Sequence, residues 1–199
     1  MLHVLAGQFK GRRLLPPPRR SRTRPITGLV KKSLFGMLQP RLEGAAVVDL
    51  FCGTGTLGLE ALSRGARACW FAERDGAVLA ALRRNIEAVG AGGRATVWGG
   101  EVTARLGERL ASIGQAVDVA FVDPPFSAAR TWARGAMEGR ILAPLAAALA
   151  AEGVVALRLP ADVSAPAPLA PLRVTRVRDY GGMAVVLLEL CGAAAAGLP

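Results

Sequence analysis

The chain has 199 residues, 52% of them hydrophobic, which suits one folded domain with a sizeable core and excludes intrinsic disorder for its body. It contains no run of about 20 apolar residues and no signal-peptide pattern, so we expect neither a membrane-spanning nor a secreted protein. Three cysteines in apolar stretches make no disulfide framework, which predicts a reduced, cytoplasmic protein.

The formal net charge of +10 is concentrated at the N-terminus. Residues 1–42 contain ten Lys or Arg and no acidic residue, whereas residues 43–199 are balanced. A solubilising arm is one interpretation, but a basic segment on a neutral body is the expected footprint of a nucleic-acid backbone. We therefore predict a basic, RNA-binding extension of the same domain. Its expected backbone contacts are Lys10, Arg12, Arg13, Arg19, Arg20, Arg22 and Arg24.

The first predicted elements lie in this extension. Residues 2–6 and 13–15 are predicted to be two short strands of a hairpin around the turn at 7–11. Three prolines at 16–18 then predict an extended, basic arm, and Thr27 is placed to cap a helix over residues 28–38.

From residue 43 onward, apolar strands alternate with helices that have apolar residues at helical spacing. The predicted strands are 46–51, 68–72, 95–98, 117–122 and 154–159, and the predicted helices are 57–64, 76–89, 102–112 and 141–150. This alternation predicts a parallel sheet covered on both faces.

The last two predicted strands, 172–179 and 184–190, are separated by only four residues, which permits only an antiparallel hairpin. A mostly parallel, doubly wound α/β sheet that ends in an antiparallel hairpin is the Rossmann-like fold of class I methyltransferases. We assign residues 43–192 to this domain and expect 193–199 to be a flexible tail.

A glycine-rich turn follows the first strand of this domain. Gly53, Gly55 and Gly58 satisfy G-x-G-x-x-G, and Glu73 ends the next strand 20 residues after Gly53, so a dinucleotide-dependent oxidoreductase is a serious alternative. Asp49 argues against it, because a carboxylate beside the loop repels a pyrophosphate by about 4 kcal/mol at 4 Å and an effective dielectric of 20. S-adenosylmethionine carries a sulfonium and an ammonium and has no phosphate, so an acidic residue suits it.

We expect the cofactor S-adenosylmethionine to lie along this loop and the two strand ends beside it. Glu73 is placed to accept the ribose hydroxyls, Glu101 to accept from the adenine amine, and Val102 to pack on the ring. Turn, helix-capping and surface roles are the alternatives for the acidic residues. The expected cofactor contacts are Asp49, Phe51, Gly53, Thr54, Gly55, Glu73, Glu101 and Val102.

The tetrapeptide Asp123-Pro124-Pro125-Phe126 follows the strand at 117–122 and is the most specific motif of the chain. Its prolines fix the backbone direction at the carboxyl end of a strand, where α/β sheets bind ligands. The Asp123 carboxylate and the Pro124 carbonyl can both accept from an exocyclic amine of a base and stabilise the charge that develops on nitrogen, while Phe126 stacks on the base. We therefore predict catalysis by Asp123, Pro124, Pro125 and Phe126.

His3 is the only histidine, so histidine-dependent nucleophilic catalysis and histidine-rich metal sites are poorly supported, and we expect no metal. A sulfonium methyl group is reactive enough to need no enzyme nucleophile. The sequence alone leaves three functions open: methylation of a guanine amine in RNA, methylation of adenine N6 in RNA or DNA, and a non-catalytic rRNA-binding assembly factor.

From residue 5 to residue 190 the chain resembles the RsmD-type bacterial methyltransferases, which act on guanine N2 of 16S ribosomal RNA. The resemblance rests on residues 7–14, 22–27, 34–35, 49–66, 123–126 and 180–181. It implies a single α/β domain that uses S-adenosylmethionine to methylate the N2 amine of a guanine in 16S rRNA or the small ribosomal subunit. We expect this domain to be a monomer.

The chain departs from the family pattern at a few positions. Gly28-Leu29 stands where the family has an Asp-Arg pair, and Lys31-Lys32 where it has Arg-Glu. Glu101 replaces Asp, and Phe126 replaces the common Tyr, and both of these changes keep the chemistry.

Overall fold

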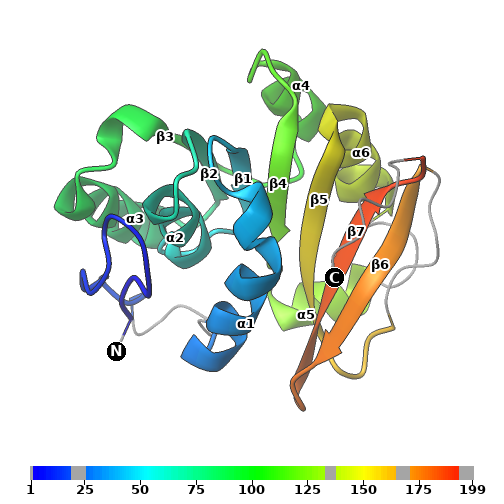
Figure 1. The fold of residues 1–199 in the computed structure, drawn as a ribbon, viewed down its shortest axis with the longest axis horizontal. Coiled ribbons are helices and arrows are strands. Elements are labelled where there is room, and N and C mark those ends of the chain that lie inside the picture. The colour runs from blue at the N-terminus through cyan, green and yellow to red at the C-terminus, as the bar shows by residue number, and fades with distance from the viewer. Residues whose placement is uncertain (1, 19–25, 133–137, 165–170, 193–199) are drawn as a thin grey trace.

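The computed structural model describes residues 2–18, 26–132, 138–164 and 171–192. Within them, seven strands form one sheet in the order β3-β2-β1-β4-β5-β7-β6 (Figure 1). The strands are β1 Ala46–Leu50, β2 Ala68–Glu73, β3 Ala95–Gly99, β4 Val117–Val122, β5 Leu149–Pro160, β6 Leu172–Asp179 and β7 Met183–Leu190. The first five are parallel, and β7 runs antiparallel between β5 and β6, which confirms the predicted sheet.

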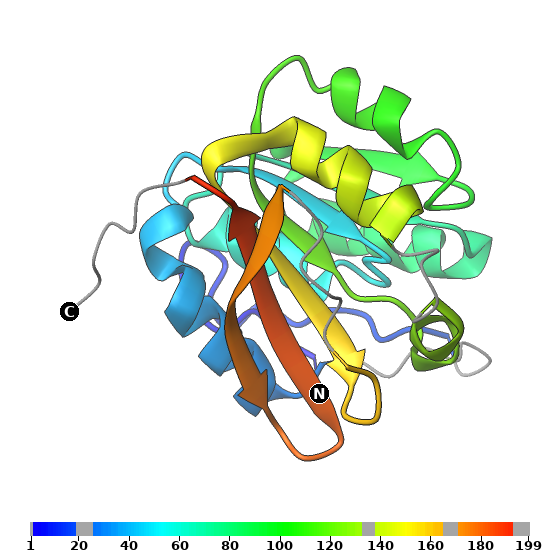
Figure 2. The same ribbon diagram turned by 90° about the vertical axis from the view of Figure 1, so that its right-hand side faces the viewer.

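Helices cover both faces of the sheet. They are α1 Gly28–Leu38, α2 Thr56–Ser63, α3 Gly76–Val89, α4 Leu106–Ala111, α5 Phe126–Trp132 and α6 Ala143–Ala148. One apolar cluster joins α1, α2 and α3 to one face, and a second joins α4, α5 and α6 to the other. Figure 2 shows α4 and α6 on the opposite side of the sheet from α1. No described helix is long and apolar enough to cross a membrane.

Several predicted boundaries were wrong. The helix expected over 102–112 begins only at Leu106, because Arg105 adopts a left-handed conformation with φ 57°. The helix expected over 141–150 is a π-helical turn, Glu138–Leu142, followed by α6, and β5 already begins at Leu149. Helix α5 was not predicted, and Cys191, expected in apolar surroundings, is exposed.

The predicted N-terminal hairpin is present but shorter than residues 2–6 and 13–15, because only the backbone N–H groups of Val4, Gly11 and Leu14 donate across it, to the carbonyls of Arg12, Val4 and Leu2. A single bridge pairs His3 with Arg13, and Gly7 turns the chain with φ 81°. A Cβ at Gly7 would lie 1.8 Å from the Ser63 carbonyl oxygen, so the close approach of this turn to α2 requires glycine. The segment therefore packs directly on the helix that follows the glycine-rich loop.

One buried carboxylate ties this segment and α1 to the sheet domain. Glu60 of α2 accepts hydrogen bonds from the backbone N–H groups of Leu5 and Ala6, at 2.7 and 3.0 Å. It also pairs with Lys31 at 3.0 Å and with Arg64 at 2.8 Å. Burial lowers the pKa of Lys31, and the Glu60 carboxylate offsets part of that shift. Lys31 is thus an internal anchor, which donates to the His3 carbonyl as well.

We predict that Glu60→Ala lowers the free energy of unfolding by about 3–5 kcal/mol, because it leaves a buried ammonium without its carboxylate. Urea denaturation followed by circular dichroism measures the change. Glu87→Ala, at an exposed position of α3, is the control and should change stability by less than about 0.5 kcal/mol. A similarly small effect for Glu60→Ala would contradict the anchoring role.

Candidate functional site

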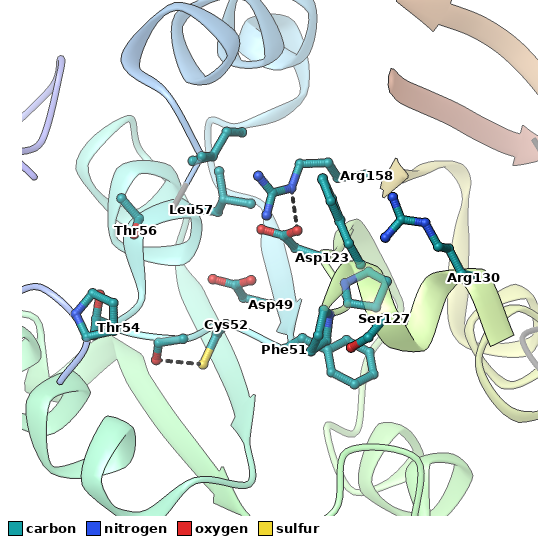
Figure 3. A pocket seen from close by; sticks show the side chains of 16 residues that line it. Asp49, Phe51, Cys52, Thr54, Thr56, Leu57, Asp123, Ser127, Arg130 and Arg158 are labelled. Carbon is teal, nitrogen blue, oxygen red and sulfur yellow. Dashed lines mark hydrogen bonds and ion pairs between the residues drawn. The ribbon is translucent and has the colours of Figure 1, made fainter. Parts of the chain in front are cut away.

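A cavity of about 370 Å³ opens at the carboxyl edge of the sheet, where β1 and β4 lie side by side (Figure 3). The cavity is surrounded by the end of β1 and its loop, the start of α2, the tetrapeptide and α5 after β4, the end of β5, and Pro17 and Ile26 nearer the N-terminus. Its lining includes Asp49, Phe51, Cys52, Gly53 and Thr54 from β1 and its loop, Asp123–Phe126, and Arg158 of β5. Two regions that the sequence singled out separately therefore share one cavity.

The glycines of the loop have different roles. A Cβ at Gly55 would lie 2.5 Å from Leu82, and one at Gly58 would lie 2.3 Å from Phe71, so both permit close internal packing of α2. Gly53, with φ 55°, lines the cavity, and a Cβ added there would meet no atom within 4 Å. Gly53 is therefore the position where the loop backbone is open to a ligand.

Asp49 is completely buried at the end of β1. Its Oδ2 accepts a hydrogen bond from the Gly58 N–H at 2.8 Å, which helps to cap the start of α2. Its Oδ1 has no hydrogen-bond donor among the described residues. Burial raises the pKa of Asp49 to about 8, with smaller contributions from the negative charges of Asp123 and Glu73. An unpartnered carboxylate oxygen in a cavity wall is suited to a cationic ligand.

Asp123 extends from the end of β4 and has a charged partner. Arg158 donates from Nε to Asp123 Oδ1 at 2.5 Å, and the two side chains are only 10% and 16% exposed. Burial raises the pKa of Asp123, and the Arg158 guanidinium opposes that shift. Figure 3 shows the Asp49 carboxylate next to that of Asp123, and the two negative charges interact. The ion pair with Arg158 is made by Oδ1 of Asp123 and does not involve Oδ2.

The sequence analysis did not identify Arg158, although the sequence around this residue indicates a functional or structural role for it. Arg158 is the single charged residue within the apolar stretch 154–159, and a charge inside a buried strand requires a partner. The guanidinium carbon also lies 5.2 Å from the centre of the Phe126 ring, in a cation–π arrangement. Arg158 therefore contacts both ends of the tetrapeptide.

The tetrapeptide also starts a helix. Pro125 accepts a hydrogen bond from the Ala129 N–H at 3.0 Å, and Phe126 is the first residue of α5. Arg130, one turn further, lines the cavity and pairs with Asp162 at 2.8 Å. Both of these side chains are more than half exposed, so the pair contributes little stability.

The other expected cofactor contacts lie beside the cavity rather than in its lining. Glu73 accepts from the backbone N–H of Gly53 at 3.1 Å through Oε2, and from those of Arg74 and Asp75 through Oε1. Glu101 is half exposed and pairs with Arg74 at 3.4 Å. Val102 is 1% exposed and belongs to the apolar cluster around α4 and α6.

The expected RNA contacts divide into two groups. Lys10, Arg12 and Arg13 are exposed on the N-terminal turns. Arg19, Arg20, Arg22 and Arg24 lie outside the described residues, but Pro17 and Ile26, on either side of them, both line the cavity. Two of the basic residues counted in 1–42 form ion pairs within the protein, because Lys31 pairs with Glu60, and Arg41 with Glu189 at 2.9 Å.

Among the described residues, no cluster of His, Cys, Asp and Glu could hold a metal ion.

Comparison with known proteins places this site in a family. Residues 2–189 match the family described as "Conserved hypothetical protein 95". The chain is 38% identical over 125 residues to "Ribosomal RNA small subunit methyltransferase D" of Escherichia coli K12, a match that spans 63% of this chain and 60% of that protein. The structure of the Escherichia coli protein yhhF is 30% identical and superposes with a TM-score of 0.77, over 95% of this chain and 97% of the other.

A more distant structure has the same fold. The "rRNA methyltransferase aviRa" of Streptomyces viridochromogenes superposes with a TM-score of 0.64 at 20% identity, over 88% of this chain and 90% of the other. The class I methyltransferase fold predicted from the sequence is thereby confirmed. With the family match across nearly the whole chain, the protein belongs to the RsmD-type family, described as "Conserved hypothetical protein 95".

Proposed function

We propose that the protein transfers a methyl group from S-adenosylmethionine to the exocyclic N2 amine of a guanine in 16S rRNA. The observation that carries this proposal is the cavity shared by Asp49 and Asp123: among the described residues Asp49 has no cationic partner, whereas Asp123 is held by Arg158. The names of the rRNA methyltransferase relatives support an rRNA substrate. RNA binding would involve Lys10, Arg12 and Arg13 together with the basic residues at 19–24.

The residues of the cavity fit the cofactor. The unpartnered Oδ1 of Asp49 suits an ammonium group, and the open backbone at Gly53 admits close contact. Glu73 and Glu101, at the ends of β2 and just after β3, would hold the adenosine portion. The Arg74–Glu101 pair is exposed and therefore easily exchanged for a ligand contact. Because Val102 is buried, its contact with an adenine would require a local rearrangement.

The tetrapeptide would hold the base. Asp123 Oδ2 and the Pro124 carbonyl accept from the two amine protons, which orients the nitrogen and stabilises the positive charge that develops on it. Phe126 offers an aromatic face for stacking, and Arg158 keeps Asp123 in place from the opposite side. When bound, S-adenosylmethionine supplies an electrophilic methyl group, so the chain itself needs no nucleophile.

The direct test uses purified protein, labelled S-adenosylmethionine, and either naked 16S rRNA or 30S subunits. Digestion to nucleosides and mass spectrometry should reveal N2-methylguanosine. Finding N6-methyladenosine would overturn the choice of base. Cofactor binding without transfer to either substrate would instead support a non-catalytic assembly factor.

We predict that Asp49→Asn makes stability less sensitive to pH. Asp49 keeps its proton in the folded state up to about pH 8 but loses it near pH 4 when unfolded. The wild type therefore loses stability relative to Asp49→Asn as pH rises from about 4 to about 8, by up to about 1.4 kcal/mol per pH unit. Urea denaturation of the cofactor-free proteins at pH 5, 6, 7 and 8 measures this difference.

The control for this series is Asp162→Asn. Arg130 lowers the pKa of the exposed Asp162, so the difference between wild type and this variant should stay flat over the same range. The Asp49→Asn variant should also bind S-adenosylmethionine about 10–100-fold more weakly, because a hydrogen bond to a charged group is lost. A flat stability difference together with unchanged cofactor affinity would contradict the role of Asp49.

We predict that Asp123→Asn reduces turnover by about 100- to 1,000-fold and leaves the cofactor dissociation constant within about threefold, because it removes the charged acceptor for the amine. Single-turnover methylation and equilibrium cofactor binding measure the two effects. Asp118→Asn, near the other end of β4, is the matched control and should retain normal turnover. Wild-type turnover in Asp123→Asn would exclude the proposed acceptor.

We predict that Arg158→Met moves the acidic limb of the rate–pH profile to higher pH. The Arg158 guanidinium offsets part of the effect of burial on Asp123. Without it, the pKa of Asp123 rises further, and the carboxylate becomes ionised only at a higher pH. Single-turnover rates between about pH 5 and 9, at saturating cofactor, measure the shift. Arg158→Lys should restore part of the profile. An equal loss at every pH would indicate a purely structural role.

A further inference from the structure

The outer strand of the sheet carries three exposed arginines that the sequence analysis did not assign. Strand β6 pairs with β7 on one side and forms the edge of the sheet (Figure 2). Arg173, Arg176 and Arg178 are all exposed along it. We propose that these three arginines form a second contact site for the phosphate backbone of RNA, next to the catalytic cavity. This inference rests on the proposed rRNA substrate.

A β-bulge brings the three arginines to one face of the sheet. In a regular strand, Arg173 and Arg176 would point to opposite faces, because side chains alternate. The register shifts between Val174 and Arg176, so that Arg173, Arg176 and Arg178 lie opposite Glu189, Leu187 and Val185 of β7. These three partners are alternate residues of one strand and share a face. The extra residue, Thr175, therefore creates a continuous row of arginines.

The same register connects the row to the catalytic site. Arg178 pairs with Val185, and Val185 pairs with Arg158 of β5, so the three residues form one line across the sheet. Neighbouring strands are about 4.8 Å apart, which places the Arg178 backbone about 10 Å from that of Arg158. Arg158 holds Asp123 in the cavity. A strand of RNA with one base in the cavity would thus pass within reach of Arg178.

Charge complementarity favours an anionic backbone as the occupant. No salt bridge joins Arg176 or Arg178 to another residue of the described chain segments, and each side chain is exposed. Of the two acidic residues in this hairpin, Glu189 pairs with Arg41, and Asp179 accepts a hydrogen bond from the Gly181 N–H at 2.7 Å. The arginine row extends over about 13 Å, because it lies opposite the four residue steps from Glu189 to Val185 and a strand rises about 3.3 Å per residue. That length spans several phosphates.

The hairpin is also fixed relative to α1. The hydroxyl of Tyr180, in the turn between β6 and β7, lies 2.5 Å from the Ser33 hydroxyl of α1. The arginines are therefore held on a defined strand and do not depend on a mobile loop. A preorganised row loses less conformational freedom on binding than a flexible arm.

Basic residues on an edge strand also prevent strand-to-strand aggregation, and this role requires no RNA. The test therefore compares the double variant Arg176→Gln/Arg178→Gln with Arg83→Gln/Arg84→Gln, which removes the same charge from exposed positions of α3. Binding of a 16S rRNA fragment is measured by fluorescence anisotropy at several salt concentrations. Circular dichroism and size-exclusion chromatography establish that each variant is folded and not aggregated.

The β6 variant should bind RNA about tenfold more weakly, and its salt slope should fall by about 1.4, which is about 0.7 for each lost contact to single-stranded RNA. Its affinity for S-adenosylmethionine should be unchanged. Arg176→Lys/Arg178→Lys should retain the wild-type slope, because it retains the charge. The α3 variant should also behave as the wild type does.

An unchanged salt slope in the β6 variant, with normal RNA binding by the wild type, would contradict the proposed RNA contact of the arginine row. It would leave the proposed function intact. Aggregation of the variant with unchanged RNA affinity would assign the arginines to edge protection and overturn the row too. Failure of the wild type to bind or methylate RNA would instead reject the proposed function on which this inference rests.

Discussion

The site depends on two buried carboxylates at the ends of neighbouring parallel strands. Asp49 and Asp123 lie on one cavity because β1 and β4 are adjacent and end at the same edge of the sheet. Their partners differ: Arg158 balances Asp123, whereas Asp49 has only a backbone N–H among the described residues. Burial raises the pKa of both carboxyl groups, but Arg158 offsets part of the effect at Asp123, and no cation does so at Asp49 among the described residues. This asymmetry suits a cationic cofactor on one side and a neutral amine on the other.

Sequence patterns predicted the parts of this site that depend on local order along the chain. A strand followed by a glycine turn identified Asp49, and a strand followed by two prolines identified Asp123. Neither motif by itself shows that β1 and β4 are neighbours in the sheet, and it is this pairing that brings the two motifs to one cavity. Arg158 was missed for the same reason: its partner is 35 residues away, and only the pairing of β4 with β5 brings the two together.

The N-terminal segment illustrates a different limit. Its charge distinguishes residues 1–42 from the rest of the sequence, but a count of basic residues could not distinguish exposed ones from internal ones. Lys31 is buried against Glu60, a residue that the sequence presented only as part of the helix after the glycine loop. Because Glu60 also accepts from Leu5 and Ala6, the turns near the N-terminus are held by the same helix that forms one wall of the cavity.

The arginine row of β6 also shows that the net charge of a segment does not reveal where its charged side chains lie in the folded structure. Residues 43–199 have no net charge, and on that basis the sequence assigned nucleic-acid contacts to the N-terminus alone. The bulge at Thr175 gathers three arginines on one face, and Glu189, an acidic residue of the neighbouring strand, pairs with Arg41. A neutral domain can thus present a basic surface, and here that surface begins two strands from Arg158, the partner of Asp123. An RNA strand held from both sides of the cavity would be fixed in direction, which positions one base at the tetrapeptide more firmly than a single basic arm.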